Sequence, residues 1–340
     1  MSIREKLKVA VLVINYNGKH YLRECLRSLK NQTYSDYDVY VVDNASVDGS
    51  VRYVHEHFPW VRVIAFKENL GFAKAYNEAI KAVDVDLIAL LNNDTRVDRN
   101  WLQELVSGIV QDELIATAGS KILLYDNPQL LNHAGTKITP IGGGFDIGLY
   151  GEDCAKHNIK GYTGAVCGAS MLLWKKTFEK IGGFDEDYFA YFEDVDLCWR
   201  MWLYGYKVLY VPSSIVYHKF GGSWGFRLSP IRLYLGCANR LRNMFKNLEL
   251  TNLVKGIFFS LVFDTARVLL LLRMKNIAGI WGVVRAYTDF FEGLRKTLRK
   301  RIEIQKNRKL SDNDLFMMGL FCSLREGLKV FSKIDIKRLG

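Results

Sequence analysis

The sequence lacks the features that mark several large protein classes. Its six cysteines are scattered, and none belongs to a C-x-x-C pair or to a metal-finger spacing. We therefore expect buried thiols in a reducing compartment. No apolar run is long and uncharged enough to be a confident membrane span, and residues 1–8 contain no apolar segment of the signal-peptide type. These absences predict a cytoplasmic protein with neither disulfides nor a structural zinc site.

Excess positive charge is missing from the first two thirds of the chain. Residues 1–223 hold 24 Lys and Arg against 27 Asp and Glu, a net charge of −3, whereas residues 224–340 hold 23 against 9, a net charge of +14. A basic tail of this kind can contact nucleic acid or an anionic membrane. Because no nucleic-acid-binding motif accompanies it, we expect no nucleic-acid partner.

Two amphipathic segments within the tail favour a membrane surface. Residues 257–272 are a largely apolar stretch, and its interruptions at Ser260, Asp264 and Arg267 share one narrow stripe of a helix. Residues 277–294 repeat the pattern, with a polar stripe of Arg285, Thr288, Asp289 and Glu292. Both segments fit helices lying on an anionic membrane at its inner face, followed by a basic run. The alternative is that they pack on the rest of the chain or on a second copy in a homodimer.

The first part of the chain is typical of an α/β fold. Four apolar, β-rich runs, at residues 9–14, 39–42, 61–64 and 87–91, alternate with helical patterns. This alternation predicts a mostly parallel sheet flanked by helices. Each run ends in polar residues, and ligands bind at the carboxyl ends of parallel strands. We therefore expect the four polar clusters to converge on one crevice.

An acidic segment follows much later in the chain. Glu193, Asp194 and Asp196 lie among aromatic residues. A carboxylate in apolar surroundings has a raised pKa, which suits a general base. The first turn of an ordinary helix also favours acidic residues, so the cluster alone does not indicate catalysis.

Taken together, these segments resemble the family-two inverting glycosyltransferases of the GT-A fold, and within them the bacterial rhamnosyltransferase-like branch. The matching segments are residues 14–17, 42–46 with 48–50, 69–73 with Asn77, 91–94, 181–186, 193–198 with Arg200, and His218. The resemblance implies a GT-A (Rossmann-like) catalytic domain over residues 1–222. Residues 223–340 would then form a helical, basic C-terminal region, and we expect the catalytic domain to fold without it.

The resemblance also implies a site for a dTDP- or UDP-sugar donor. In the family, the residue at the position of Asp43 accepts a hydrogen bond from the imide N–H of the base. The other donor-side residues that the resemblance implies are Asn15, Asn17, Asn69, Gly71, Ala73 and Asn93. Ordinary turn chemistry is the alternative explanation for each Asn and Gly.

The metal and the base are implied in the same way. Asn92-Asn93-Asp94 occupies the position of the family's metal-binding D-x-D, with Asn in place of the first Asp. Asp94 and His218 are the implied ligands of Mn²⁺ or Mg²⁺, whereas we do not expect Asn92 to bind the metal directly. Asp194 is the implied general base, with Glu193 and Asp196 in support.

These residues lead to one preferred function and two alternatives. The preferred function is inverting transfer of a sugar, with rhamnose first, to a hydroxyl of a glycan or polyprenyl-linked glycan acceptor in cell-surface polysaccharide synthesis. One alternative is a transferase that acts on a soluble or protein acceptor and dimerises through its tail. The other is a non-catalytic scaffold that binds nucleotide sugars.

Overall fold

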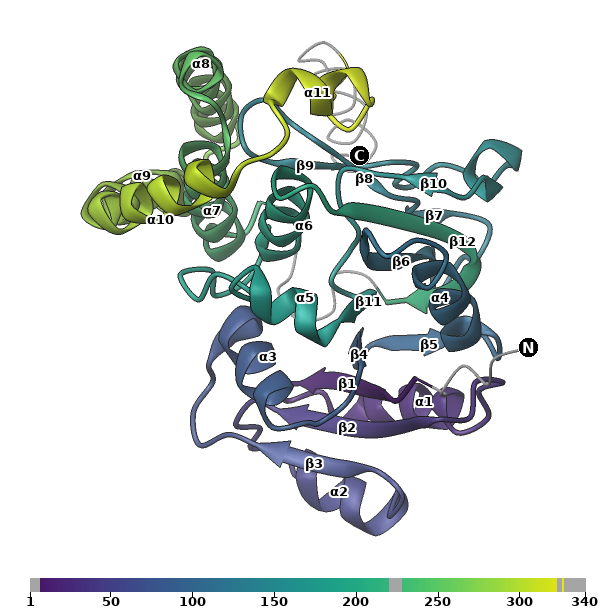
Figure 1. The fold of residues 1–340 in the computed structure, drawn as a ribbon. Helices are drawn as coiled ribbons and strands as arrows, with labels where there is room; N and C mark the ends of the chain where they lie inside the picture. The colour runs from purple at the N-terminus through teal and green to yellow at the C-terminus, as the bar shows by residue number, and fades with distance from the viewer. Residues whose placement is uncertain (1–6, 220–227, 323–325, 327–340) are drawn as a thin grey trace.

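A ten-stranded sheet forms the centre of the protein (Figure 1). The computed structural model describes residues 7–219, 228–322 and 326. Within these residues the strand order is β10-β12-β6-β11-β4-β1-β2-β3, with β5 beside β12 and β7 beside β6; β8 and β9 form a separate pair. The strands are β1 (Val9–Asn15), β2 (Tyr37–Asp43), β3 (Arg62–Ala65), β4 (Leu87–Asn92), β5 (Thr95–Val97), β6 (Ile115–Leu124), β7 (Leu131–His133), β8 (Thr136–Ile138), β9 (Gly144–Asp146), β10 (Gly161–Tyr162), β11 (Ser170–Trp174) and β12 (Lys207–His218).

Helices connect the strands and then form the C-terminal part of the chain. The helices are α1 (Lys19–Leu29), α2 (Ser50–His57), α3 (Gly71–Lys81), α4 (Trp101–Ile109), the short η1 (Ala155–Asn158), α5 (Lys175–Lys180), α6 (Glu193–Leu203), α7 (Pro230–Asn247), α8 (Leu250–Arg273), α9 (Ile277–Glu292), α10 (Leu294–Asn307) and α11 (Asp312–Met317). Helices α7 to α10 gather on one side of the molecule, at the left of Figure 1.

The four predicted strands are confirmed as β1 to β4, and they run parallel in the order β3-β2-β1-β4. The sequences of β1 and β4 are continuously apolar because both of these strands are covered on both faces. Beyond β4 the sheet becomes mixed, since β11 is antiparallel to both β4 and β6. This mixed half brings β12, and with it His218, back to the edge where the parallel strands end.

The C-terminal helices share a hydrophobic core with the sheet. Leu233, Cys237 and Phe290 belong to the same buried cluster as Leu12 and Leu90 of the parallel strands. The chain also returns to the small β8–β9 pair, where the backbone N–H of Cys322 donates to the carbonyl of Ile138 (2.9 Å). The domain boundary predicted between residues 222 and 223 lies outside the described residues. The described residues before and after this boundary pack into one shared hydrophobic core.

Helix α8 is amphipathic as predicted, but its polar stripe points into the protein. Ser260 and Asp264 are 1% and 4% exposed. Both contact the buried Arg240 of α7, which donates to Ser260 Oγ (2.8 Å) and pairs with the Asp264 carboxylate. The outward face carries the exposed apolar side chains of Leu250, Val254, Phe258, Phe259, Leu261, Val262, Leu269 and Leu272. Within the described residues, every helix is too short or too polar to cross a membrane.

Candidate active site

The polar segments that follow the parallel strands meet at one edge of the sheet. Asn15, Asp43 and Asn92 end strands β1, β2 and β4, which are parallel neighbours. An open cleft of about 780 Å³ lies over this edge. The residues selected individually from the sequence that line it are Asn17, Asn69, Gly71, Asn92, Asn93, Asp94, Glu193, Asp194 and His218. The structure therefore contains the predicted crevice.

A buried chain of hydrogen bonds underlies the donor side of the cleft. Asn15 donates from Nδ2 to Asp43 Oδ1 (2.9 Å) and accepts at Oδ1 from Asn93 Nδ2 (2.7 Å). The second Asp43 oxygen accepts from the backbone N–H of Ser46 (2.9 Å). Asn15 and Asp43 are 1% and 2% exposed, and neither lines the cleft. In this structure they hold the cleft floor in place and do not form its surface.

Two further asparagines organise the loops above this floor. Asn17 has a left-handed backbone conformation (φ 50°), and its Oδ1 accepts from the backbone N–H of Val47 (2.8 Å). Asn44 donates from Nδ2 to Asn69 Oδ1 (2.9 Å) and so joins the loops after β2 and β3. These two bonds join separate loops, and Asn69 Oδ1 also accepts from the backbone N–H of Gly71 (3.0 Å), an Asx turn within its own loop. Because Asn17, Asn44 and Asn69 all line the cleft, a turn role and a binding role are compatible here.

Gly71 and Ala73 begin helix α3 in different environments. Gly71 has φ +75°, and a Cβ at this position would lie 2.5 Å from the carbonyl oxygen of Phe189. The missing side chain therefore admits the loop that precedes α6, and Gly71 also lines the cleft. Ala73 is fully buried in the core and does not line the cleft.

Asp94 and His218 form a close pair in the cleft. The distance from His218 Nε2 to Asp94 Oδ1 is 3.1 Å, and both side chains are almost fully buried. His218 Nδ1 lies 2.8 Å from Asn132 Oδ1, which orients the ring so that Nε2 faces Asp94. Burial opposes ionisation of Asp94, but the charge and hydrogen bond of His218 outweigh it and hold the pKa of this carboxyl below its usual value.

The donor set around this pair fits a divalent cation. Carboxylate oxygen and imidazole nitrogen are ligands of Mn²⁺, and carboxylate oxygen also suits Mg²⁺. Asn92 Oδ1 is buried in the same cleft and has no hydrogen-bond partner among the described residues. In the described part of the chain, no three His, Cys, Asp or Glu side chains form a metal-like group. The protein therefore offers a partial ligand set that a donor diphosphate could complete.

The acidic segment begins helix α6 and faces the cleft with two of its carboxylates. Asp194 Oδ2 accepts from the backbone N–H of Gly168 (2.9 Å), and its Oδ1 accepts from that of Val195 (2.8 Å). Burial raises the pKa of the Asp194 carboxyl, although these hydrogen bonds oppose the shift. Burial, followed by the charge of Asp194, raises the pKa of Glu193 well above its usual range. The charge of Asp194 therefore acts on Glu193, but its effect is smaller than that of burial.

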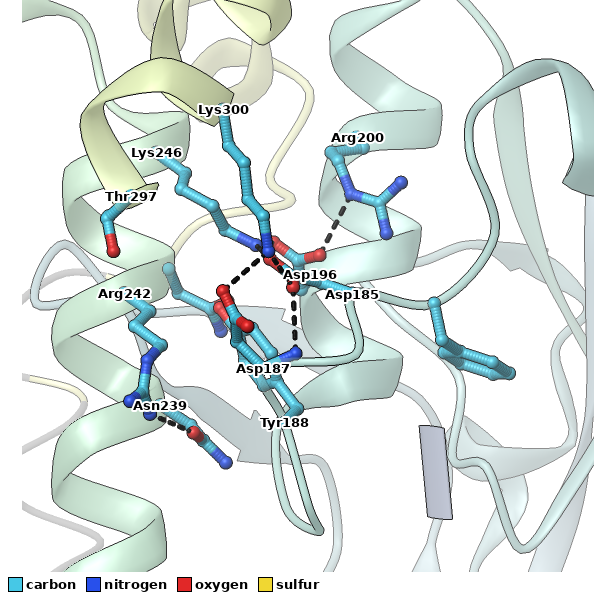
Figure 2. A network of polar contacts seen from close by, with 12 residues as sticks. Asp185, Asp187, Tyr188, Asp196, Arg200, Asn239, Arg242, Lys246, Thr297 and Lys300 are labelled. Carbon is cyan, nitrogen blue, oxygen red and sulfur yellow. Dashed lines mark hydrogen bonds and ion pairs between the residues drawn. The ribbon is translucent and has the colours of Figure 1, made fainter. Parts of the chain in front are cut away.

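Asp196, the third acid of the segment, points away from the cleft into an ion-pair network (Figure 2). Arg200 Nε lies 2.8 Å from one Asp196 oxygen, and Lys246 Nζ lies 2.8 Å from the other. Lys246 and Lys300 both pair with Asp185. Since Lys246 comes from α7 and Lys300 from α10, the network joins the C-terminal helices to α6. Asp196 therefore supports the helix that carries Asp194.

The loop before α6 is held in an unusual conformation. Tyr191 and Phe192 have φ values of 73° and 66°, in the left-handed region that non-glycine residues rarely adopt. Asn239 of α7 donates from Nδ2 to the carbonyl oxygens of Ala190 (2.9 Å) and Tyr191 (2.8 Å). Such strain persists only where the surroundings impose the conformation. Helix α7 therefore helps to place the start of α6 at Glu193, one residue before Asp194.

Several cleft-lining residues were not predicted from the sequence, including three from β9 and α7. Asp146 of β9 lines the cleft, and its charge adds to the raised pKa of Asp194. Arg232 and Gly236 come from α7, in the basic tail, for which the sequence predicts membrane contact or packing on the rest of the chain but no binding residue. Because both residues lie far from the motifs in the sequence, their position at the cleft could not be inferred from the sequence alone. Only the packing of α7 against the loop at residues 188–192 brings them to the cleft.

Comparisons with known proteins agree with this geometry. The profile described as glycosyl transferase family 2 matches residues 10–182, just over half of the chain, and one described as the N-terminal domain of galactosyltransferase matches residues 153–220. N-acetylglucosaminyl-diphospho-decaprenol L-rhamnosyltransferase of Mycobacterium tuberculosis is 26% identical over 240 residues, covering 63% of this chain and 77% of that protein. Rhamnosyltransferase WbbL of Escherichia coli is 27% identical over 225 residues, covering 62% and 83%. An uncharacterized protein of Sinorhizobium fredii is 26% identical over 236 residues, but the match covers only 25% of its length.

Other proteins of known structure share this fold. A mannosyltransferase from Pyrobaculum calidifontis, in complex with GDP-Man and Mn²⁺, aligns with a TM-score of 0.55 at 17% identity, covering 86% of this chain and 76% of that one. At this identity the likeness concerns the fold alone, which is the GT-A fold with a helical C-terminal region. With the family profile covering half of the sequence, the chain belongs to glycosyl transferase family 2, where it resembles rhamnosyltransferases.

Proposed function

We propose that this glycosyltransferase moves a sugar from a dTDP- or UDP-sugar, with inversion, to a hydroxyl of a glycan or lipid-linked glycan. One observation carries the proposal: a single cleft holds both the Asp94–His218 pair and Asp194, whose pKa is raised. The first can hold the diphosphate end of a donor, and the second can accept a proton from an acceptor.

In the proposed reaction, the acceptor hydroxyl attacks the anomeric carbon while Asp194 takes its proton. A bond forms between the acceptor oxygen and this carbon, and the bond to the diphosphate oxygen breaks. A raised pKa makes Asp194 a better proton acceptor than an ordinary aspartate. A divalent cation bound beside Asp94 would neutralise charge on the departing diphosphate. One displacement inverts the anomeric configuration, so no enzyme nucleophile is required.

The proposed donor and acceptor rest on the relatives. Both relatives described by name are rhamnosyltransferases, and the name of the mycobacterial one specifies a polyprenyl-diphosphate-linked acceptor. We therefore place dTDP-rhamnose first among donors and a polyprenyl-linked glycan of cell-surface polysaccharide synthesis first among acceptors. Such an acceptor lies in a membrane, and the reaction would take place at the cytoplasmic face.

The outward face of α8 supports this location. Eight apolar side chains from Leu250 to Leu272 point away from the protein, because the polar stripe is used for contacts with α7. The exposed cations Lys255, Arg273 and Lys275 flank the face. An apolar helix face with basic neighbours fits the interface of an anionic membrane. We propose that α8 lies on this surface, with homodimerisation through the same face as the alternative.

Donor binding and transfer test the catalytic proposal. The full chain is titrated with dTDP-rhamnose and with UDP-hexoses, with and without Mn²⁺, and then assayed for transfer to a polyprenyl-diphosphate-linked sugar. We expect Mn²⁺-dependent binding of at least one donor, followed by transfer. A chain that binds donors yet neither transfers nor hydrolyses them would instead be a nucleotide-sugar-binding scaffold.

Vesicle pelleting tests the membrane proposal. Leu261→Ser and Leu269→Ser on the α8 face should reduce binding to anionic vesicles, whereas Leu114→Ser, at an exposed leucine between α4 and β6, should not. Neutral vesicles should bind the wild type less well, and salt should weaken binding without abolishing it. If the wild type does not bind vesicles but its molecular mass in solution doubles as the protein concentration rises, the result would indicate the homodimer.

A further inference from the structure

Helix α7 forms one wall of the catalytic cleft, through Arg232 and Gly236. The helix is fixed in this position, because Asn239 is fully buried and donates to the loop carbonyls of Ala190 and Tyr191. Asn243, one turn further, accepts a hydrogen bond at Oδ1 from the hydroxyl of Tyr188 (2.6 Å). Arg232 is therefore held at the cleft by contacts that do not involve its own side chain.

Arg232 gives an otherwise acidic cleft one cationic corner. Among the described residues that line the cleft, Arg232 is the only Arg or Lys, whereas four are acidic: Asp94, Asp146, Glu193 and Asp194. Its guanidinium lies 5.3 Å from the ring centroid of Tyr191, which restricts its orientation. The residue also stands in the first turn of α7, where the helix dipole adds partial positive charge. Arginine in such a setting suits phosphate oxygens.

An apolar rim lies beside this corner. Ile231, next to Arg232, is 37% exposed, and Trp281 of α9 is 67% exposed. Helix α9 touches the start of α7, since a Cβ at Gly282 would lie 2.5 Å from the carbonyl oxygen of Pro230. Both exposed apolar side chains thus lie outside the cleft near the start of α7, where an isoprenoid chain that leaves the cleft beside Arg232 can contact them.

We infer that Arg232 binds the phosphate of a prenyl-diphosphate-linked acceptor, with the prenyl chain running over Ile231 and Trp281. The inference rests on the proposed function, in which the donor diphosphate belongs with Asp94 and His218. It assigns the acceptor phosphate to a different wall of the same cleft. Helix α7 of the basic tail is then part of the acceptor site.

Equilibrium binding of two lipids to the full chain tests the inference. The probes are farnesyl diphosphate and farnesol, and saturating dTDP with Mn²⁺ is present throughout so that the donor site is filled. The wild type should bind farnesyl diphosphate at least about tenfold more tightly than farnesol, as expected for hydrogen bonds to a charged group. Arg232→Met should remove this preference, and Arg232→Lys should retain part of it. The control is Arg285→Met, because Arg285 also stacks on a tyrosine (4.7 Å to the Tyr234 centroid) but does not line the cleft.

The outcomes separate this inference from the proposed function. Equal affinity of the wild type for both lipids, or a preference that survives Arg232→Met, overturns the assignment of Arg232. So does farnesyl diphosphate binding that appears only in a parallel titration without dTDP, since the lipid diphosphate would then occupy the donor site. A chain that binds neither dTDP nor UDP in the presence of Mn²⁺ contradicts the proposed function itself.

Discussion

Lys246 of α7 lies 2.8 Å from the carboxylate of Asp196, which stands two residues after Asp194 on α6. Both side chains are almost fully buried. Lys246 also pairs with Asp185, whose carboxyl has a pKa far below its usual value because the charges of Lys246 and Lys300 outweigh the effect of burial. The C-terminal helices are thus joined to the catalytic helix by charges that are costly to leave unpaired.

Lys246→Met should strongly destabilise the protein. Removing one member of a buried charged network leaves carboxylates without compensation, which costs about 3 kcal/mol or more. The free energy of unfolding is measured by urea denaturation. Lys296→Met is the matched control, because Lys296 pairs with Asp187 from an exposed position and should matter little. A Lys246→Met protein as stable as wild type would contradict the proposed link between tail and core.

Asn239→Ala should lower kcat while leaving donor binding nearly unchanged. The two hydrogen bonds that Asn239 donates hold the left-handed residues just before α6, so their loss lets Asp194 move. We expect a fall in kcat of about tenfold, since small misplacements of reacting groups are costly. Donor affinity comes from calorimetry, and Asn252→Ala, whose amide bonds Asp312 within the tail, serves as control. An equal loss in both variants would mean that the effect is general destabilisation.

Asp94→Ala and His218→Ala should each weaken Mn²⁺-dependent donor binding, and Asp94→Ala should weaken it more. A carboxylate supplies charge as well as a lone pair, whereas imidazole supplies only the lone pair. Asn132→Ala should have a smaller effect, because Asn132 only orients His218. The measurement is donor affinity with Mn²⁺ and with a chelator. If the wild type has the same donor affinity with Mn²⁺ and with a chelator, donor binding does not depend on a metal and this assignment is contradicted.

The rate of transfer should fall as the pH drops through the raised pKa of Asp194. A base must be ionised to act, and burial places this ionisation above the ordinary aspartate range of about 3.9. The same shift means that the folded state holds its proton to higher pH than the unfolded state, so stability decreases as the pH rises across that interval. The measurement is kcat against pH at saturating donor. Donor binding over the same range serves as control, and a flat profile down to pH 4 would contradict the role.

The sequence predicted the parallel half of the sheet and the crevice because both depend on local patterns. Apolar runs ending in polar turns identify β1 to β4, and their parallel order brings the turns together. The orientation of α8 could not be predicted, because periodicity defines two faces without saying which is buried. Ser260 and Asp264 face inward because Arg240, from another helix, needs partners.

The expectation that the catalytic domain folds without its tail was limited in the same way, because it depends on contacts with a distant part of the chain. Asp185 and Asp196 belong to family motifs, yet in this structure they pair with Lys246 of the tail. Nothing in the local sequence indicates this pairing. The structure therefore leads us to expect that a chain truncated near residue 223 is unstable, since it would lose both partners and part of the shared core.

The most direct test of the account is transfer by wild type and Asp194→Asn on the same donor and acceptor. Asparagine keeps the size of the side chain and one hydrogen-bond acceptor but cannot take the proton. We predict a fall in kcat of about a hundredfold or more, with donor affinity nearly unchanged because the base acts on the acceptor. Asp84→Asn, at an exposed position before β4, is the matched control. Near-normal transfer by Asp194→Asn, with product formed at the wild-type rate, would contradict the central claim.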